Sequence, residues 1–180
     1  METPELKAYT IPFIGLKTGL HEWHFEVDNT FFTHFGFEEF LEANIQLEVR
    51  MEKKPTFLEF ALSFNGHVQV NCDLTNEVFA QQLEGNFQFV VKFGDTFNNE
   101  NEALLILPHG SHEVNIQQQV YESIVLAVPT KRIHPGVLDG SLESDILERL
   151  EALSPEETNS KNNNDTDPRW DTLKDLLTDK

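Results

Sequence analysis

Two histidines stand three residues apart at His109 and His112, a spacing at which imidazole rings can bind one metal ion. A third ligand would have to come from a distant position, namely Cys72, His67 or His134. His109 follows a proline in a polar stretch where solvated histidines are common, so a solvated loop is the favoured interpretation. A metal-dependent enzyme that uses His109 and His112 remains one alternative function.

Cys72 is the only cysteine, and as a nucleophile it would need a basic partner that lowers the pKa of its thiol. Its neighbours Asn71 and Asp73 act in the opposite direction, which favours a core or strand-end cysteine. Carboxylates are so abundant that no pair is singled out for acid–base catalysis. The glycines form neither a phosphate-binding loop nor a dinucleotide fingerprint. We therefore predict no catalytic residue, no metal ligand and no cofactor.

The charge of the chain limits its partners. Its 180 residues include 31 acidic and 13 basic ones, for a formal net charge of -18. Such a chain is repelled by a phosphate backbone, so we expect no DNA binding and no strong direct contact with RNA. Two small basic clusters, Arg50/Lys53/Lys54 and Lys131/Arg132, are interpreted as solvated turns. No apolar run approaches a membrane span and the N-terminus is acidic, which predicts a cytoplasmic protein without membrane contact.

The elements that must position these side chains are mostly strands. Apolar and polar residues alternate with the period of a half-buried strand in several segments. These segments are 24–27, 45–51, 57–64, 67–72, 78–83 and 87–93. Asn65-Gly66 predicts a two-residue hairpin, and Glu84-Gly85-Asn86 lies between the last two segments. The predicted fold class is α+β: an antiparallel, strongly curved sheet of about five or more strands, a few packed helices and a flexible acidic C-terminal segment.

Four helices are predicted, each from a residue that can cap its first turn, and the last three also from an apolar stripe. They are Phe31–Leu41 with Asp28, Ile116–Val128 with Asn115, Leu142–Leu153 with Ser141, and 167–177 with Asp167. Between residues 98 and 112 the chain reads as a loop, apart from the apolar run Ala103–Leu107.

The composition changes at Ser154, after which the chain holds no large apolar residue for a dozen positions. We predict a single α+β domain over 1–153, a disordered linker over 154–166 and an amphipathic helix within 167–180. Trp170, Leu173 and Leu177 form the apolar stripe of that helix. An isolated helix of this length is marginal in water, so its stripe needs a surface on which to dock.

Three stretches taken together carry a family resemblance. They are Val70-Asn71-Cys72-Asp73-Leu74-Thr75 followed by Phe79, Val120–Pro129 followed by His134, and Asp167-Pro168-Arg169-Trp170-Asp171-Thr172-Leu173. In this order and spacing the chain resembles the YceD family, the large ribosomal RNA subunit accumulation proteins, and Gly19–Trp23 with Asp28 and Phe31-Phe32 fit the same pattern. Family members usually show Cys-x-Arg-Cys after the central strand, whereas here Leu74 and Thr75 stand where the arginine and the second cysteine would be. A metal or redox role for that pair therefore cannot operate in this chain.

The resemblance implies a non-enzymatic factor that supports the accumulation of large-subunit ribosomal RNA. Ribosomal proteins are cationic, so an acidic protein would attract them, and less so at high salt. We expect the partner to be a basic ribosomal protein or a pre-ribosomal particle. Candidate partner-binding residues are Asp167, Pro168, Arg169, Trp170, Leu173, Glu122 and His134, and Cys72 and Asp73 mark the family motif.

Structural roles compete with these assignments. Packing and helix termination are favoured over partner contact for Glu122 and His134, whereas Trp170 could equally dock on a partner or on its own sheet. A second alternative function is a small apolar-ligand binding module, because a curved sheet rich in phenylalanine could enclose a cavity.

Overall fold

The structure is a computed structural model that describes residues 6–142 and 144–154. The chain divides into two compact units, residues 1–143 and 144–180. The predicted linker beyond Ser154 and the predicted helix in 167–180 lie outside the described residues. The single domain predicted over 1–153 stays a prediction.

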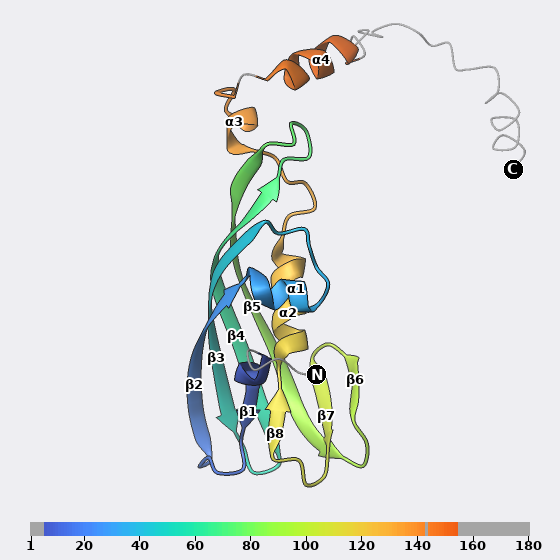
Figure 1. The fold of residues 1–180 in the computed structure, drawn as a ribbon. Coiled ribbons are helices and arrows are strands. Elements are labelled where there is room, and N and C mark those ends of the chain that lie inside the picture. The colour runs from blue at the N-terminus through green and yellow to red at the C-terminus, as the bar shows by residue number, and fades with distance from the viewer. Residues whose placement is uncertain (1–5, 143, 155–180) are drawn as a thin grey trace, which may run out of the picture. The chain divides into compact units, whose positions relative to one another are not determined.

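A six-stranded sheet dominates the first unit, in the order β2-β3-β4-β5-β7-β6 (Figure 1). Its strands are β2 (Gly19–Asp28), β3 (Glu42–Lys53), β4 (Phe57–Asn71), β5 (Val78–Gly94), β6 (Asn98–Asn101) and β7 (Leu104–Pro108). All neighbours are antiparallel except β5 and β7, which run parallel. A short 3₁₀ helix η1 (Leu6–Tyr9) leads into β1 (Thr10–Pro12), which pairs with β8 (Glu113–Asn115) as a separate two-stranded sheet. The predicted α+β class is confirmed, the sheet is open, and its strong curvature stays a prediction.

The predicted Asn65-Gly66 hairpin is wrong, because β4 continues through it to Asn71. Gly66 has a φ of 156° and lies against the neighbouring strand, where an added Cβ would stand 2.2 Å from the carbonyl oxygen of Asn44. Glycine is needed there for a close backbone approach and not for a turn. The break assumed at Glu84–Asn86 is also wrong: β5 continues through Gly85, where an added Cβ would stand 2.5 Å from the Phe64 ring.

Three of the described helices are shorter than predicted, and the short helix α3 was not predicted. They are α1 (Asn29–His34), α2 (Gln117–Ala127), α3 (Pro135–Leu138) and α4 (Asp145–Leu153). Asp28 caps α1 as expected, but the helix ends at His34 because Gly36, with a φ of 70°, takes the left-handed conformation that stops helices. Asn115 Oδ1 accepts a hydrogen bond from the Gln117 amide at 2.9 Å. Ser144, and not Ser141, caps α4, so the start predicted at Leu142 is wrong.

The predicted loop over 98–112 contains more structure than expected. Strand β6 begins at Asn98, and after a turn the chain returns as β7, which pairs with β6. The expected apolar run forms β7, and this strand ends one residue later than the run, at Pro108. Asn98 and Asn101 accept hydrogen bonds at Oδ1 from the amides of Glu100 and Ala103, so the polar side chains there shape the turn.

One face of the six-stranded sheet is covered and the other is not. β1, β8, α1 and α2 lie on the same side of the sheet (Figure 1), where Val120 and Ile124 of α2 join the buried core. Aromatic rings fill much of this layer: Tyr121 stacks on Phe35 at 4.3 Å between centroids, and Phe60 stacks on Phe89 at 4.9 Å. Such burial provides most of the free energy that favours folding.

No helix in the described parts of the chain is long and apolar enough to cross a membrane.

Candidate functional site

The family motif forms a tight turn between β4 and β5. The Cys72 amide donates to the Glu77 carbonyl at 2.8 Å, and the Asn76 amide donates to the Cys72 carbonyl at 2.9 Å. Asn76 takes a φ of 60°, which asparagine tolerates better than most residues. Cys72 and Thr75 are buried inside this turn, whereas Asp73 and Leu74 point outward.

Asp73 and Arg132 join this turn to the segment that follows α2. The Asp73 amide donates to the Arg132 carbonyl at 2.8 Å, and Asp73 Oδ2 accepts from the Arg132 amide at 2.7 Å. The Arg132 guanidinium lies 3.4 Å from Asp73 Oδ1 and 2.9 Å from Glu39 Oε2. Three distant parts of the sequence are therefore linked through one arginine.

Cys72, Asp73, Glu39, Arg132 and His134 form one cluster around this turn. Within it, the thiol of Cys72 has the most strongly shifted pKa. Burial alone would raise its pKa, but hydrogen bonds from the Thr75 hydroxyl and from the amides of His134, Thr75 and Leu74 lower the pKa to about 7. The His134 amide lies 3.3 Å from Cys72 Sγ. The buried strand-end position is the one expected, whereas the expected direction of the pKa shift is wrong. The error arises because hydrogen bonds from Leu74 and Thr75 in the same turn, together with one from His134 in a distant segment, lower the pKa of the thiol.

His134 is held by its surroundings at the same place. Its ring packs edge-on against Phe79 at 5.6 Å between centroids, and its Nδ1 accepts from the Gly136 amide at 3.0 Å, which caps α3. These are the contacts of a packing residue, and its contact with a partner stays a prediction. The structure thus brings Cys72, Asp73 and His134 together.

Glu122 does not join this cluster through any contact that the structure shows. It lies on α2 half-buried, where its Oε1 accepts from Gln118 Nε2 at 2.8 Å, one helical turn earlier. The remaining partner-binding candidates, Asp167 to Leu173, lie outside the described residues.

An open apolar groove of about 230 Å³ adjoins the cluster. Phe37, Phe40, Val125, Val128 and Pro129 line it, and Glu39 and Arg132 stand among its polar lining residues. A small apolar side chain fits such a groove better than a charged group does.

Two basic residues have structural roles that sequence reasoning missed. Arg132 is 27% exposed in its contacts with Glu39 and Asp73. Lys53 donates from Nζ to the carbonyls of Phe13 at 2.7 Å and Leu16 at 2.8 Å. Interpreting both as parts of solvated turns was wrong. Their partners are 37 or more residues away in sequence, so no local pattern marked them.

The two histidines of the metal hypothesis lie near the turn between β7 and β8. His112 is largely exposed, with Nε2 4.0 Å from the Glu113 carboxylate, and His109 is also exposed. Within residues 6–142 and 144–154, no three His, Cys, Asp or Glu side chains form a group that could hold a metal ion. The metal alternative gains no support from this arrangement.

The comparison with known families shows to which family the chain belongs. The sequence model of the family described as "Large ribosomal RNA subunit accumulation protein YceD" matches residues 60–177. The chain belongs to the YceD family. The matched span includes the Cys72 turn, α2 and the Asp167–Leu173 stretch, whereas Gly19–Trp23 precedes it. No curated protein and no solved structure matches the chain.

Membership of the YceD family suggests a role in the accumulation of ribosomal RNA of the large subunit. The position at which family members usually carry the second cysteine is Thr75 in this YceD protein, 4% exposed, with its hydroxyl hydrogen-bonded to Cys72. The neighbouring Leu74 is 41% exposed. The Thr75 hydroxyl therefore forms a hydrogen bond with the Cys72 thiol, at the position where family members usually carry a second cysteine.

Proposed function

We propose that this YceD protein supports large-subunit ribosomal RNA accumulation without catalysing a reaction, by binding a basic assembly partner in the cytoplasm. The partner is a basic ribosomal protein or a pre-ribosomal particle that displays one. The observation that carries the proposal is the net charge of -18 in a member of this family. Opposite charge speeds association and favours cationic over anionic partners.

The ion pairs support this proposal, because three basic side chains each contact two carboxylates. Arg50 Nε lies 3.1 Å from Glu22 and 2.6 Å from Glu48. Lys54 Nζ lies 2.7 Å from Glu59 and 3.8 Å from Glu52, and Arg132 contacts Glu39 and Asp73. Each cluster keeps one excess negative charge, so the protein's own cations do not neutralise its carboxylates.

The apolar-ligand alternative is not favoured. Phenylalanine side chains pack against one another on the covered face of the sheet, and the sheet is open between its edge strands β2 and β6. The groove beside the Cys72 turn is open to solvent and is not an enclosed cavity.

Depletion of the protein in its native cell tests the role directly. We expect the ratio of large-subunit to small-subunit ribosomal RNA to fall, and the wild-type chain supplied in trans to restore it. A normal ratio after complete depletion would contradict the proposal.

Capture from lysate tests the partner. The wild-type chain should retain a basic ribosomal protein at low salt and release it as salt screens the attraction. The same capture with a chain ending at Ser154, and with Trp170→Ala in the full chain, tells whether the Asp167–Leu173 candidates take part. Unchanged capture by both would assign binding to residues 1–154.

A further inference from the structure

The face of the six-stranded sheet opposite α1 and α2 carries no covering element among the described residues of the first unit (Figure 1). Side chains alternate across each strand, and the registers bring Leu20, Glu52, Glu59 and Val90 into one row across four strands. Every residue of this face on β2, β3, β4 and β5 is exposed or half-buried, and none is buried. In the described part of the first unit, this face of the four long strands β2, β3, β4 and β5 is therefore open.

The charge of this face is strongly one-sided. Its glutamates are Glu22 and Glu26 on β2, Glu42, Glu48 and Glu52 on β3, Glu59 on β4 and Glu84 on β5. Arg50, Lys92 and the adjoining Lys54 are its basic side chains. Seven glutamates against three cations leave an excess of four negative charges on these side chains.

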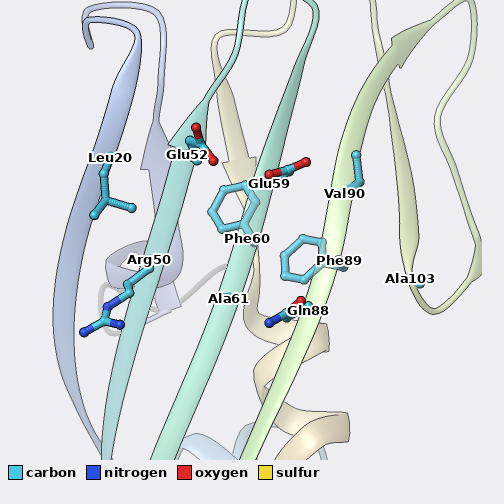
Figure 2. Close-up of a pocket in the computed structure, with 10 residues that line it drawn as sticks. All are labelled: Leu20, Arg50, Glu52, Glu59, Phe60, Ala61, Gln88, Phe89, Val90 and Ala103. Carbon is cyan, nitrogen blue, oxygen red and sulfur yellow. The ribbon is translucent and has the colours of Figure 1, made fainter.

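A shallow groove of about 520 Å³ crosses this face at β3, β4 and β5. Ala61 lies directly between Arg50 and Gln88 of the neighbouring strands, and its small side chain leaves the hollow between these two long ones. Figure 2 shows Glu52 and Glu59 beside this hollow, with Leu20 at one side and Val90 at the other. Aliphatic surface and carboxylates thus lie within one groove.

Glu52 and Glu59 face each other across the β3–β4 ladder, a position in which like charges repel. Lys54 offsets part of this repulsion, but its ammonium is much closer to Glu59, at 2.7 Å, than to Glu52, at 3.8 Å. A second cation bound beside Glu52 would reduce the remaining repulsion.

We propose that this uncovered face is the docking surface for an extended, lysine- and arginine-rich segment of the protein's partner, seated along the groove at Ala61. The inference rests on the proposed function, since it names the surface that receives the basic partner. Lysine and arginine suit the groove because one aliphatic stem can cover Leu20 and another Val90, while the charged heads reach Glu52 and Glu59. Nucleic acid and a second copy of the same face are both repelled by this charge.

The test uses the full chain and a synthetic lysine- and arginine-rich peptide labelled for fluorescence anisotropy. The face variant is Glu52→Gln with Glu59→Gln, and the matched control is Glu38→Gln with Glu113→Gln. Both control residues are exposed and lie off this face, on the loop after α1 and on β8. The two variants have the same net charge, so any difference between them reports position and not overall charge.

We expect the face variant to bind the peptide about three- to tenfold more weakly than the wild type, and the control to change much less. Lys92→Gln should strengthen binding, because it removes a cation from the same face. Equal weakening in the face variant and the control would overturn the proposed surface and leave the proposed function standing. A wild-type chain that fails to bind the peptide at low salt would overturn both.

Discussion

Hydrogen bonds to Cys72 make the stability of the protein depend on pH. Its pKa is about 7 in the folded chain, against a model-compound value of 9.0, because amides of Leu74, Thr75 and His134 and the Thr75 hydroxyl stabilise the thiolate. The unfolded chain then binds more protons than the folded chain between these two values. The contribution of Cys72 to the unfolding free energy should therefore rise as pH increases from 7 to 9.

Denaturant unfolding of the wild type and of Cys72→Ser across this range measures that contribution. Serine does not titrate here, so the difference in unfolding free energy between the two proteins should grow from pH 7 to pH 9 and level off on either side. A constant difference across the range would show that the thiol keeps an ordinary pKa.

Gly66 tests whether close strand approach, and not a turn, explains a glycine in β4. Gly66→Ala would place its Cβ 2.2 Å from the Asn44 carbonyl oxygen and 2.7 Å from Ile45 Cα. Both are backbone atoms, so neither can move away without a shift of the whole strand. We expect a loss of more than about 2 kcal/mol of unfolding free energy. Gly15→Ala is the control, because nothing lies within 4 Å of its added Cβ. Equal unfolding free energies for the two variants would contradict this explanation.

Local signals in the sequence predicted the starts of α1 and α2 well, but they predicted the start of α4 and the ends of the strands poorly. Asp28 and Asn115 accept hydrogen bonds from amides two residues later, an interaction that needs no knowledge of the rest of the fold. Asn65-Gly66 also looks local, but the alternation of Leu62, Phe64, Val68 and Val70 continues in step through Gly66. Counting that period across the glycine would have predicted one long strand.

Pairings between distant segments could not be predicted from patterns. β1 pairs with β8 more than a hundred residues later, and β7 lies parallel to β5 with β6 as the outer strand. The site shares this property, because Cys72, Asp73 and Arg132 meet through segments about sixty residues apart. The family resemblance marked Cys72, Asp73 and His134, whereas Arg132 and Glu39 emerged only from the fold.

The turn after β4 and the segment after α2 depend on Asp73 for their connection. Asp73→Ala removes the acceptor of the Arg132 amide and the partner of its guanidinium, and should lower the unfolding free energy by about 1–2 kcal/mol. Asp73→Asn keeps a side-chain oxygen for the amide and should cost less. Hydrogen exchange at the Arg132 amide gives an independent measure, and it should quicken in Asp73→Ala above all. Unchanged protection there would mean that other contacts hold the two segments together.

At the scale of the whole molecule, the excess of carboxylates should make salt act on stability and on binding with opposite signs. Repulsion among like charges destabilises the folded chain, and added salt screens it, so the unfolding free energy should rise with ionic strength. The attraction to a basic partner is screened by the same ions, so binding of the cationic peptide should weaken. Urea, which is uncharged, allows unfolding to be measured at each salt concentration without changing the ionic strength.

Glu52→Gln separates these two effects at one position. It removes the repulsion against Glu59 while leaving the 2.7 Å contact of Lys54 with Glu59, so the unfolding free energy should stay equal or rise by up to about 0.5 kcal/mol. Peptide binding by the same variant should nevertheless weaken. A wild-type chain whose unfolding free energy falls with salt would show instead that its shared ion pairs outweigh its repulsion, and the carboxylates would then serve the fold before they serve a partner.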